Sequence, residues 1–384
     1  MKKIIHSLFI LMLCGCWNYN ELNNYSIATG MAIDYEDNKY IVSFLISNGK
    51  KENGSSNHSY QATLYSGEGM TIYEAIKNIE LLSPKQLYIG HLTSIVISES
   101  VAKRGLYDSL EYLLEDSSSK KNFYVVLAKG SSAKDILSIT NPMTEFSSES
   151  ISDNIEASNK LQGNIIAKTY NDVIYDLVND GVDTAINSYV IVGDVNKGIT
   201  TKNLESVEPS AYIKLDDLGI FKGDKLVAWA NKNESMCINI INNDVDNIYI
   251  NTDCGDGHIV ISANGLKTKK NINKDSITIK TIGNATIREV TCDIDLEDNN
   301  NMNDLKIKVD NKIKDMIKNG YIFARSNGSD VFGLGLSLYR NNPEYYNSID
   351  WYDTYLNLEP EIDVDITIEP NSTLKQNIMR DFHE

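Results

Sequence analysis

Two hydrophobic spacings alternate along residues 25–138 and limit the folds open to the chain. From Thr71 to Leu82, apolar residues recur three and four positions apart, which marks one buried face of a helix. Neighbouring patterns predict helices at 101–114 and 133–139, and strands at 27–33, 40–46, 60–65, 87–97 and 123–128. Strands and helices that alternate in this way favour mixed α/β layers.

The second half is dominated by short strands between residues 211 and 292, separated by turn signals. A helix over 303–318 follows, which Asn319-Gly320 is expected to end, and another begins at Pro343. Residues 362–369 alternate apolar and acidic or polar side chains, which predicts a half-buried strand. The fold class we expect is therefore α+β, multi-domain, with mixed β-sheets flanked by helices.

The length of 384 residues corresponds to two or three ordinary domains. After a helix at 170–178 and a strand at 185–192, the stretch 193–209 is rich in polar and turn residues. We place a boundary there, between an N-terminal region 16–205 and a C-terminal region 206–384. The Ser- and Asn-rich residues 140–163 are either a mobile connection, which would split the first region, or a loosely packed helix pair.

The first fifteen residues are typical of a signal peptide. Lys2 and Lys3 precede an apolar run, Ile4 to Leu13, that has about half the twenty residues needed to span a bilayer. The sequence Leu13-Cys14-Gly15-Cys16 then resembles a bacterial lipobox, in which a diacylglyceryl group is joined to the Cys16 sulfur and the chain is cut after Gly15. The alternative is an ordinary signal peptide with an incidental cysteine. We expect lipid attachment at Cys16 and removal of residues 1–15.

The charge excludes one broad class of function. The chain carries 36 Lys and Arg against 53 Asp and Glu, a net charge of −17 that becomes −19 once Lys2 and Lys3 leave. Non-specific nucleic-acid binding draws its affinity from basic side chains, so no nucleic-acid partner is expected. Polybasic docking on anionic lipid is disfavoured for the same reason.

No pattern of catalytic or metal-binding residues stands out. His91 and His258 lie near predicted elements, but neither has a His or Cys partner at zinc spacing, and no common hydrolase or phosphate-binding motif occurs. The acidic side chains of residues 361–369 belong to the solvent face of a strand rather than a calcium loop, and residues 253–258 form a turn between strands. We expect no catalytic residue, no metal and no cofactor.

Three cysteines remain if residues 1–15 are removed and Cys16 is alkylated. Cys237, Cys254 and Cys292 all lie in or beside predicted strands, where a free cysteine behaves as a small hydrophobic residue. Two of them could pair in an exported protein, but we favour three thiols.

Aromatic residues gather on and before one predicted helix near the C-terminus. They are Tyr339, Tyr345, Tyr346, Trp351, Tyr352 and Tyr355. Core packing is the first interpretation, and a patch that faces a partner is the second. The partner-contact candidates are Trp229, Tyr345, Tyr346 and Trp351.

Three regions together resemble the Ger(x)C family, the lipoprotein C subunits of nutrient germinant receptors in bacterial spores. The first combines Gly15-Cys16-Trp17 with residues 28–34, ATGMAID, and the second runs from Gly90-His91-Leu92 through residues 102–106, AKRGL. The third combines residues 225–229, KLVAW, with residues 329–335, SDVFGLG, Pro343 and Trp351. Tyr345-Tyr346 departs from the tryptophan usual in the family near Pro343.

The resemblance implies three α/β domains without an enzymatic site. It also implies a place on the outer face of the inner spore membrane, and two partners, an A subunit with membrane and soluble parts and an integral-membrane B subunit. The function we expect is assembly and signal coupling in spore germination. The main alternative is a solute-binding lipoprotein of a transporter, and a third hypothesis is an exported hydrolase.

Overall fold

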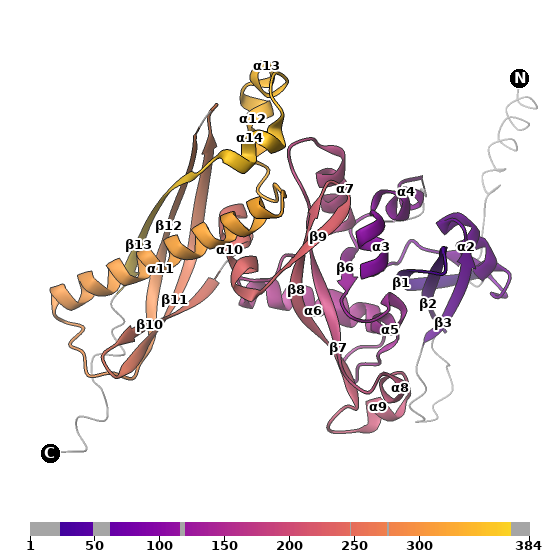
Figure 1. The fold of residues 1–384 in the computed structure, drawn as a ribbon. Coiled ribbons are helices and arrows are strands. Elements are labelled where there is room, and N and C mark those ends of the chain that lie inside the picture. Colours follow the sequence, from indigo (N-terminus) through magenta and orange to yellow (C-terminus); the bar gives the residue numbers. More distant parts are fainter. Residues whose placement is uncertain (1–23, 49–61, 116–119, 246, 275, 370–384) are drawn as a thin grey trace, which may run out of the picture.

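The computed structural model describes residues 24–48, 62–115, 120–245, 247–274 and 276–369. These residues build two β-sheets with helices packed against both, so the predicted class of mixed sheets flanked by helices is confirmed. Figure 1 shows the first sheet with its helices on one side of the molecule and the second sheet on the other. Within the described residues, no helix is both long and apolar enough to cross a bilayer.

The first sheet has nine strands in the order β3-β2-β1-β5-β6-β7-β8-β9, with β4 beside the start of β1. Its middle, from β1 to β7, is parallel, and antiparallel hairpins flank it on both sides. The strand bounds are β1 Tyr25–Glu36, β2 Lys39–Ser47, β3 Ala62–Gly69, β4 Gln86–Tyr88, β5 Ser94–Ser98, β6 Tyr124–Ala128, β7 Ala185–Gly193, β8 Ala211–Lys222 and β9 Lys225–Ala230.

Helices cover both faces of the first sheet, because its central strands are apolar on both sides. In β1, Met31 and Ile33 point into one core and Ala32 into the other. The first core is covered by α2 Ile72–Glu80, α3 Glu99–Arg104, α4 Tyr107–Glu115 and α7 Tyr170–Val178. The second is covered by α5 Ala133–Ser138 and α6 Ser147–Leu161.

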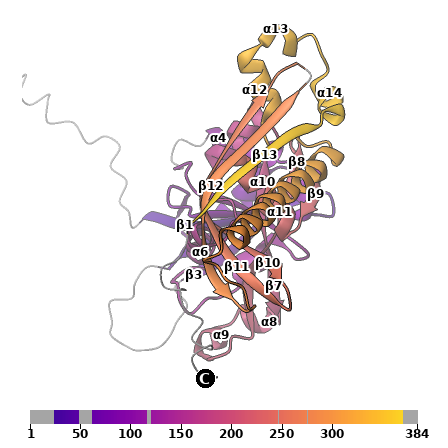
Figure 2. The same ribbon diagram turned by 90° about the vertical axis from the view of Figure 1, so that its left-hand side faces the viewer.

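The second sheet has the order β10-β11-β12-β13, and its last strand joins in parallel. Its strands are β10 Asn247–Cys254, β11 Gly257–Ile272, β12 Ile277–Val290 and β13 Pro360–Glu369. Buried and exposed side chains alternate along β10, so one face of the sheet is apolar and the other is open to solvent. Figure 2 shows α11 lying across this sheet.

Five helices belong to the second sheet and its connections. They are α10 Lys232–Asn242, α11 Asn299–Ser326, α12 Leu334–Asn341, α13 Pro343–Tyr346 and α14 Trp351–Asn357. Asn342 caps α13 through its side chain, which confirms the predicted start at Pro343. In β13, Ile362 and Ile366 are buried, while Asp363 and Asp365 are exposed and pair with Lys280 and Lys306, as expected for a half-buried strand rather than a calcium loop.

One predicted helix end was wrong. Helix α11 runs on past Asn319-Gly320 to Ser326. Gly320 is needed for a different reason: a Cβ at this position would overlap the side chain of Cys237 on α10. The glycine therefore permits a close helix crossing inside a continuous helix, and α10 itself was not predicted.

Two other stretches differ in detail from the sequence-based expectation. The predicted helix 101–114 is two helices, α3 and α4, which separate at Gly105 where φ is +142°. Residues 147–161 form the single helix α6, whose Ser148 packs close to Gly30 of β1, so this part of 140–163 is a packed helix. Small side chains, rather than large apolar ones, allow this approach.

The stretch 193–209, where we expect a boundary, joins two paired strands of the first sheet. It contains two one-turn helices, α8 Val195–Gly198 and α9 Lys202–Glu205, and β7 pairs with β8 on its far side. The first sheet therefore continues through residue 205 to Ala230. The division into regions 16–205 and 206–384 stays a prediction. In the structure the last strand of the first sheet, β9, ends at Ala230, and the strands of the second sheet follow it.

Candidate functional site at the junction of the two sheets

Two short segments, one packed with each sheet, are held together by hydrogen bonds between the two parts of the molecule. One is the turn before β7, and the other is the loop between α11 and α12. The backbone N–H of Asp183 donates to the carbonyl of Asp330 at 2.9 Å. The backbone N–H of Asp330 in turn donates to the Asp183 carboxylate at 2.7 Å. We call these segments, residues 181–184 and 329–335, the junction.

Each junction carboxylate is surrounded by hydrogen-bond donors. Asp183 also accepts from the backbone N–H of Gly223 at 2.7 Å and from the Tyr352 hydroxyl at 3.0 Å. Asp330 accepts three hydrogen bonds, from the backbone N–H of Leu334 and of Gly335 and from the indole N–H of Trp351. A buried carboxylate is tolerated when donors satisfy its oxygens, and here the donors come from three separate parts of the chain: Gly223, the segment 329–335, and residues 351 and 352.

Burial dominates the electrostatics of the junction. It raises the pKa of the fully buried Asp330 to about 6, although the N–H groups of Gly335 and Leu334 oppose the shift. Burial also raises the pKa of Asp183, opposed by its backbone hydrogen bonds. The pKa of Lys270 is lowered by burial, and its ammonium donates to the Phe332 carbonyl at 2.6 Å and to the Asn242 side chain at 2.8 Å.

Glycines allow the two segments to touch. Gly181 has φ of +77°, and a Cβ there would lie 2.6 Å from the backbone of Gly335. The N–H of Leu336 donates to the carbonyl of Gly181 at 2.7 Å, so the contact is between backbones. A Cβ on Gly335 would overlap the indole of Trp351. Larger residues would push the segments apart.

A small polar cavity of 200 Å³ opens beside the junction. Five charged side chains line it: Lys168, Asp176, Asp183, Asp244 and Lys270. Lys168 and Asp176 form an ion pair at 2.6 Å. Among the described residues no group of three or more His, Cys, Asp or Glu is placed to hold a metal ion. The hydrogen-bonded carboxylates of the junction are suited to fixing the orientation of the two sheets.

The partner-contact candidates fall in two separate places. Trp351, only 4% exposed, is a core residue whose ring stacks on Tyr355 at 5.8 Å, so it does not contribute a surface in this structure. Tyr345 and Tyr346 on α13 are half-buried nearby, and Tyr346 lies between the rings of Tyr339 and Trp351. Trp229 lies on β9 of the first sheet, partly buried under Lys129. Cys16 falls outside the described residues.

Asp183 and Asp330 are not among the residues that the sequence patterns predicted to be functional. Signals for both were present: Asp330 lies inside residues 329–335, SDVFGLG, and Asp183 follows Val182 just before an apolar strand. A carboxylate enclosed by apolar residues and glycines is a pattern that points to burial. Asp183 and Asp330, however, are 147 residues apart in the chain, and no local pattern reveals that they bond to each other.

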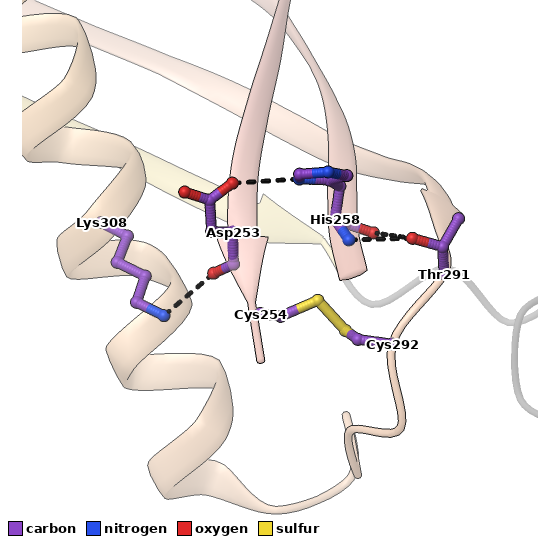
Figure 3. Close-up of a disulfide and its surroundings, with 6 residues drawn as sticks. All are labelled: Asp253, Cys254, His258, Thr291, Cys292 and Lys308. Carbon is purple, nitrogen blue, oxygen red and sulfur yellow. Dashed lines mark hydrogen bonds and ion pairs between the residues drawn. A yellow bond between two sulfur atoms is a disulfide. The ribbon is translucent and has the colours of Figure 1, made fainter. Parts of the chain in front are cut away.

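A disulfide at the far end of the second sheet corrects the expectation of three thiols. Cys254 at the end of β10 is bonded to Cys292 just after β12 (Figure 3). Cys237 on α10 is a buried free thiol. Gly257 makes this possible, because a Cβ there would lie 2.8 Å from the backbone of residues 291 and 292. The resulting Cα–Cα distance of 6.0 Å is ordinary for a disulfide.

The same region tests the hydrolase hypothesis. The turn predicted at 253–258 is the hairpin between β10 and β11, and His258 Nδ1 lies 3.0 Å from a carboxylate oxygen of Asp253 (Figure 3). Such a pair resembles a base and its orienting acid. The Thr291 hydroxyl, however, bonds to the backbone of His258 and not to its ring, and the side chains of His258 and Asp253 are both largely exposed. The pair is best explained as a surface contact of the hairpin.

Two family descriptions match the chain in succession. Residues 18–191 match the spore germination protein N-terminal domain, and residues 216–371 match the family described as spore germination B3/GerAC like, C-terminal. Residues 192–215 lie between the two matches, and they comprise the end of β7, the connection to β8 and the start of β8.

Relatives and a solved structure agree with these matches. The chain is 25% identical to spore germination protein KC of Bacillus subtilis (strain 168) over 96% of its own length and 94% of the relative. It is 27% identical to spore germination protein B3 of the same organism over 37% and 38% of the two chains. The crystal structure of the GerBC protein superposes with a TM-score of 0.56 at 17% identity, covering 91% of this chain and 99% of that one, which supports the fold.

Proposed function

The chain belongs to the spore germination B3/GerAC-like family, and from this we propose that it is the membrane-tethered C subunit of a nutrient germinant receptor. A role in spore germination follows from the family itself. The finer proposal is that a diacylglyceryl group on Cys16 holds the protein on the outer face of the inner spore membrane. There it would assemble with an A subunit and an integral-membrane B subunit.

One observation carries this proposal above the others. The similarity to spore germination protein KC extends over 96% of the chain, so both sheets and the junction fall within it. Similarity over a short segment alone would not support the same function for the whole chain. The sequence of the first sixteen residues adds the expected site of lipid attachment.

The proposed mechanism is non-enzymatic coupling. Lipidation would confine the protein beside its partners and raise their effective concentration, so modest contacts between proteins would persist. The junction would then matter because reciprocal hydrogen bonds between Asp183 and Asp330 hold the two sheets in one orientation. A displacement at one sheet would be passed to the other rather than absorbed between them.

The half-buried Tyr345 and Tyr346 are the proposed partner contacts. They project from the short helix α13, which Figure 1 shows at the tip of the second part of the molecule. Aromatic side chains that are partly exposed at a protruding tip are well suited to a protein interface. Trp351 would support them from the core, and Trp229 would belong to a second contact on β9.

The test is a crosslinking pull-down from spore membranes combined with a germination assay. We expect the polytopic A and B subunits to be captured with the wild-type chain and lost with Cys16→Ala, which cannot be acylated. Spores that lack the gene should fail to respond to one set of nutrients while nutrient-independent triggers still work. A normal nutrient response in a strain without paralogues would contradict the proposal.

A further inference from the structure

Two leucines at the end of α2 are exposed where the rest of that helix is well packed. Ile72, Ala75, Ile76 and Ile79 are buried against the first sheet. Leu81 and Leu82, which follow directly, are 83% and 58% exposed. Exposed apolar side chains that gather in one place mark interaction sites, whereas single ones are ordinary on a protein surface.

These leucines lie beside the first residues of β1. Tyr25 pairs with Gln86 of β4, and the hydroxyls of Ser26 and Ser83 are 2.8 Å apart. The ring centroids of Tyr25 and Tyr88 are 5.4 Å apart, and both rings are partly exposed. We call Tyr25, Leu81, Leu82, Lys85 and Tyr88 the α2–β4 edge. Figure 1 shows α2 and β1 together at the end of the molecule remote from the second sheet.

The length of chain before this edge identifies what it faces. Nine residue steps separate Cys16 from Tyr25, and an extended chain of that length reaches at most about 30 Å. If Cys16 carries the lipid, as the proposed function requires, Tyr25 cannot lie farther than this from the membrane. The α2–β4 edge, which contains Tyr25, is then held within that reach of the bilayer.

We propose that the α2–β4 edge docks on the lipid–water interface of the membrane, with Leu81 and Leu82 entering it. The side chains fit that environment. Tyrosine rings are amphipathic and suited to the headgroup level, and Lys85 offers a cation to phosphate groups. The acidic Glu80 is paired with Lys77 at 2.8 Å, which limits local repulsion.

The charge of the remaining chain explains why contact is confined to this edge. With a net charge of −19 after residues 1–15 leave, most of the surface would be repelled by anionic headgroups. The lipid and the two leucines would act as two anchors on one side of the fold. A second anchor would fix the orientation of the protein, which a single flexible tether would leave free.

The experiment uses the full-length lipidated chain with Leu82→Cys, labelled with a fluorophore and reconstituted into vesicles of phosphatidylglycerol and phosphatidylethanolamine without other receptor subunits. The introduced thiol is the accessible one, because Cys237 is buried and Cys254 and Cys292 are bonded to each other. Iodide quenching of the label should fall at least about threefold on reconstitution, as expected for a side chain that enters the interface.

Tyr249→Cys is the matched control. Tyr249 is 56% exposed, nearly the same as Leu82, but it lies on β10 in the second sheet. A label there should be quenched equally with and without vesicles. Adding Leu81→Ser to the Leu82→Cys chain should restore part of the quenching, since Leu81 is exposed and its replacement leaves the core unchanged.

The outcomes separate this inference from the proposed function. A chain that floats with the vesicles while its residue-82 label stays fully quenched would overturn the docked edge and leave the lipid tether standing. Protection that appears only when receptor subunits are added would also overturn it, in favour of a protein partner. If the chain purified from cells proved to be unacylated at Cys16 and did not float with the vesicles, both the docked edge and the lipid tether would be overturned.

Discussion

The indole N–H of Trp351 donates a hydrogen bond of 3.1 Å to the fully buried carboxylate of Asp330. This bond connects α14 to the loop between α11 and α12, at the point where that loop meets the turn before β7. Through Trp351, the aromatic cluster near the C-terminus is therefore bonded to the junction between the sheets.

Trp351→Phe should lower the free energy of unfolding by about 1.5–3 kcal/mol, because a hydrogen bond to a charged group is lost while an aromatic ring remains. Urea denaturation measures the change. The control is Tyr339→Phe, whose side chain is exposed and which should change stability by less than about 0.5 kcal/mol. Equal stabilities for Trp351→Phe and wild type would show that the bond contributes nothing.

Asp330 should give the protein a distinctive pH dependence. Its pKa is about 6 in the folded chain against an ordinary value of 3.8, so between these values the folded state holds a proton that the unfolded state has lost. The stability from this group is fully present below about pH 4 and is lost as the pH rises to about 6, a change on the order of 3 kcal/mol.

Asp330→Asn removes the titrating group, so this variant lacks the loss of stability that Asp330 causes in the wild type. The unfolding free energy of the wild type minus that of the variant should therefore fall from about pH 4 to about pH 6. Denaturant titrations at intervals across that range measure it. Asp256→Asn, on the exposed turn between β10 and β11, should follow the wild-type curve. A constant difference between Asp330→Asn and wild type would refute the assignment.

Gly181→Ala should destabilise the protein much more than Gly255→Ala. Both glycines have positive φ, +77° and +59°, so each alanine adds backbone strain of about 1–2 kcal/mol. At Gly181 the new Cβ also meets the backbone of Gly335 at 2.6 Å, whereas at Gly255 nothing lies within 4 Å. Thermal unfolding of the two variants compares them directly. Similar losses of stability would mean that the segments of the junction can move apart at little cost.

Removing the disulfide should weaken the second sheet. Cys254 and Cys292 are 38 positions apart, and closing a loop of that size stabilises a fold by about 4 kcal/mol in the chain-entropy model. The double variant Cys254→Ser with Cys292→Ser should therefore unfold at lower denaturant than wild type. A reductant should lower the wild-type midpoint toward that of the variant and leave the variant unchanged, and an unchanged wild type would contradict this.

How much of this could be predicted from the sequence depends on the range of the signal. Periodicity located α2, α7 and the terminal strand, because a buried stripe repeats locally. It missed α10, although Asn231 and Glu234 form a capping box at its start. All of residues 235–241 in this helix are buried, polar ones included, so no alternation of apolar and exposed polar positions marks it. Gly320 resembled a helix end and proved to be a crossing point, which only the neighbouring helix reveals.

The junction and the disulfide were beyond local reasoning for a similar reason. Asp183 and Asp330 are recognisable as a site only through their hydrogen bond to each other. Cys254 comes close to Cys292 only when the register of β10, β11 and β12 is known. The family resemblance identified the segment 329–335 without indicating that its aspartate is buried. Pairings between distant positions need the topology first.

The place of β1 in its sheet has a mechanical consequence. This strand pairs with β2 on one side and with β4 and β5 on the other, so a force on the chain before Tyr25 acts along strands held by hydrogen bonds at both edges. Such a load must shear many bonds at once instead of peeling them one after another. Tension applied from that end would therefore move the body as a whole before it could pull the leading strand loose.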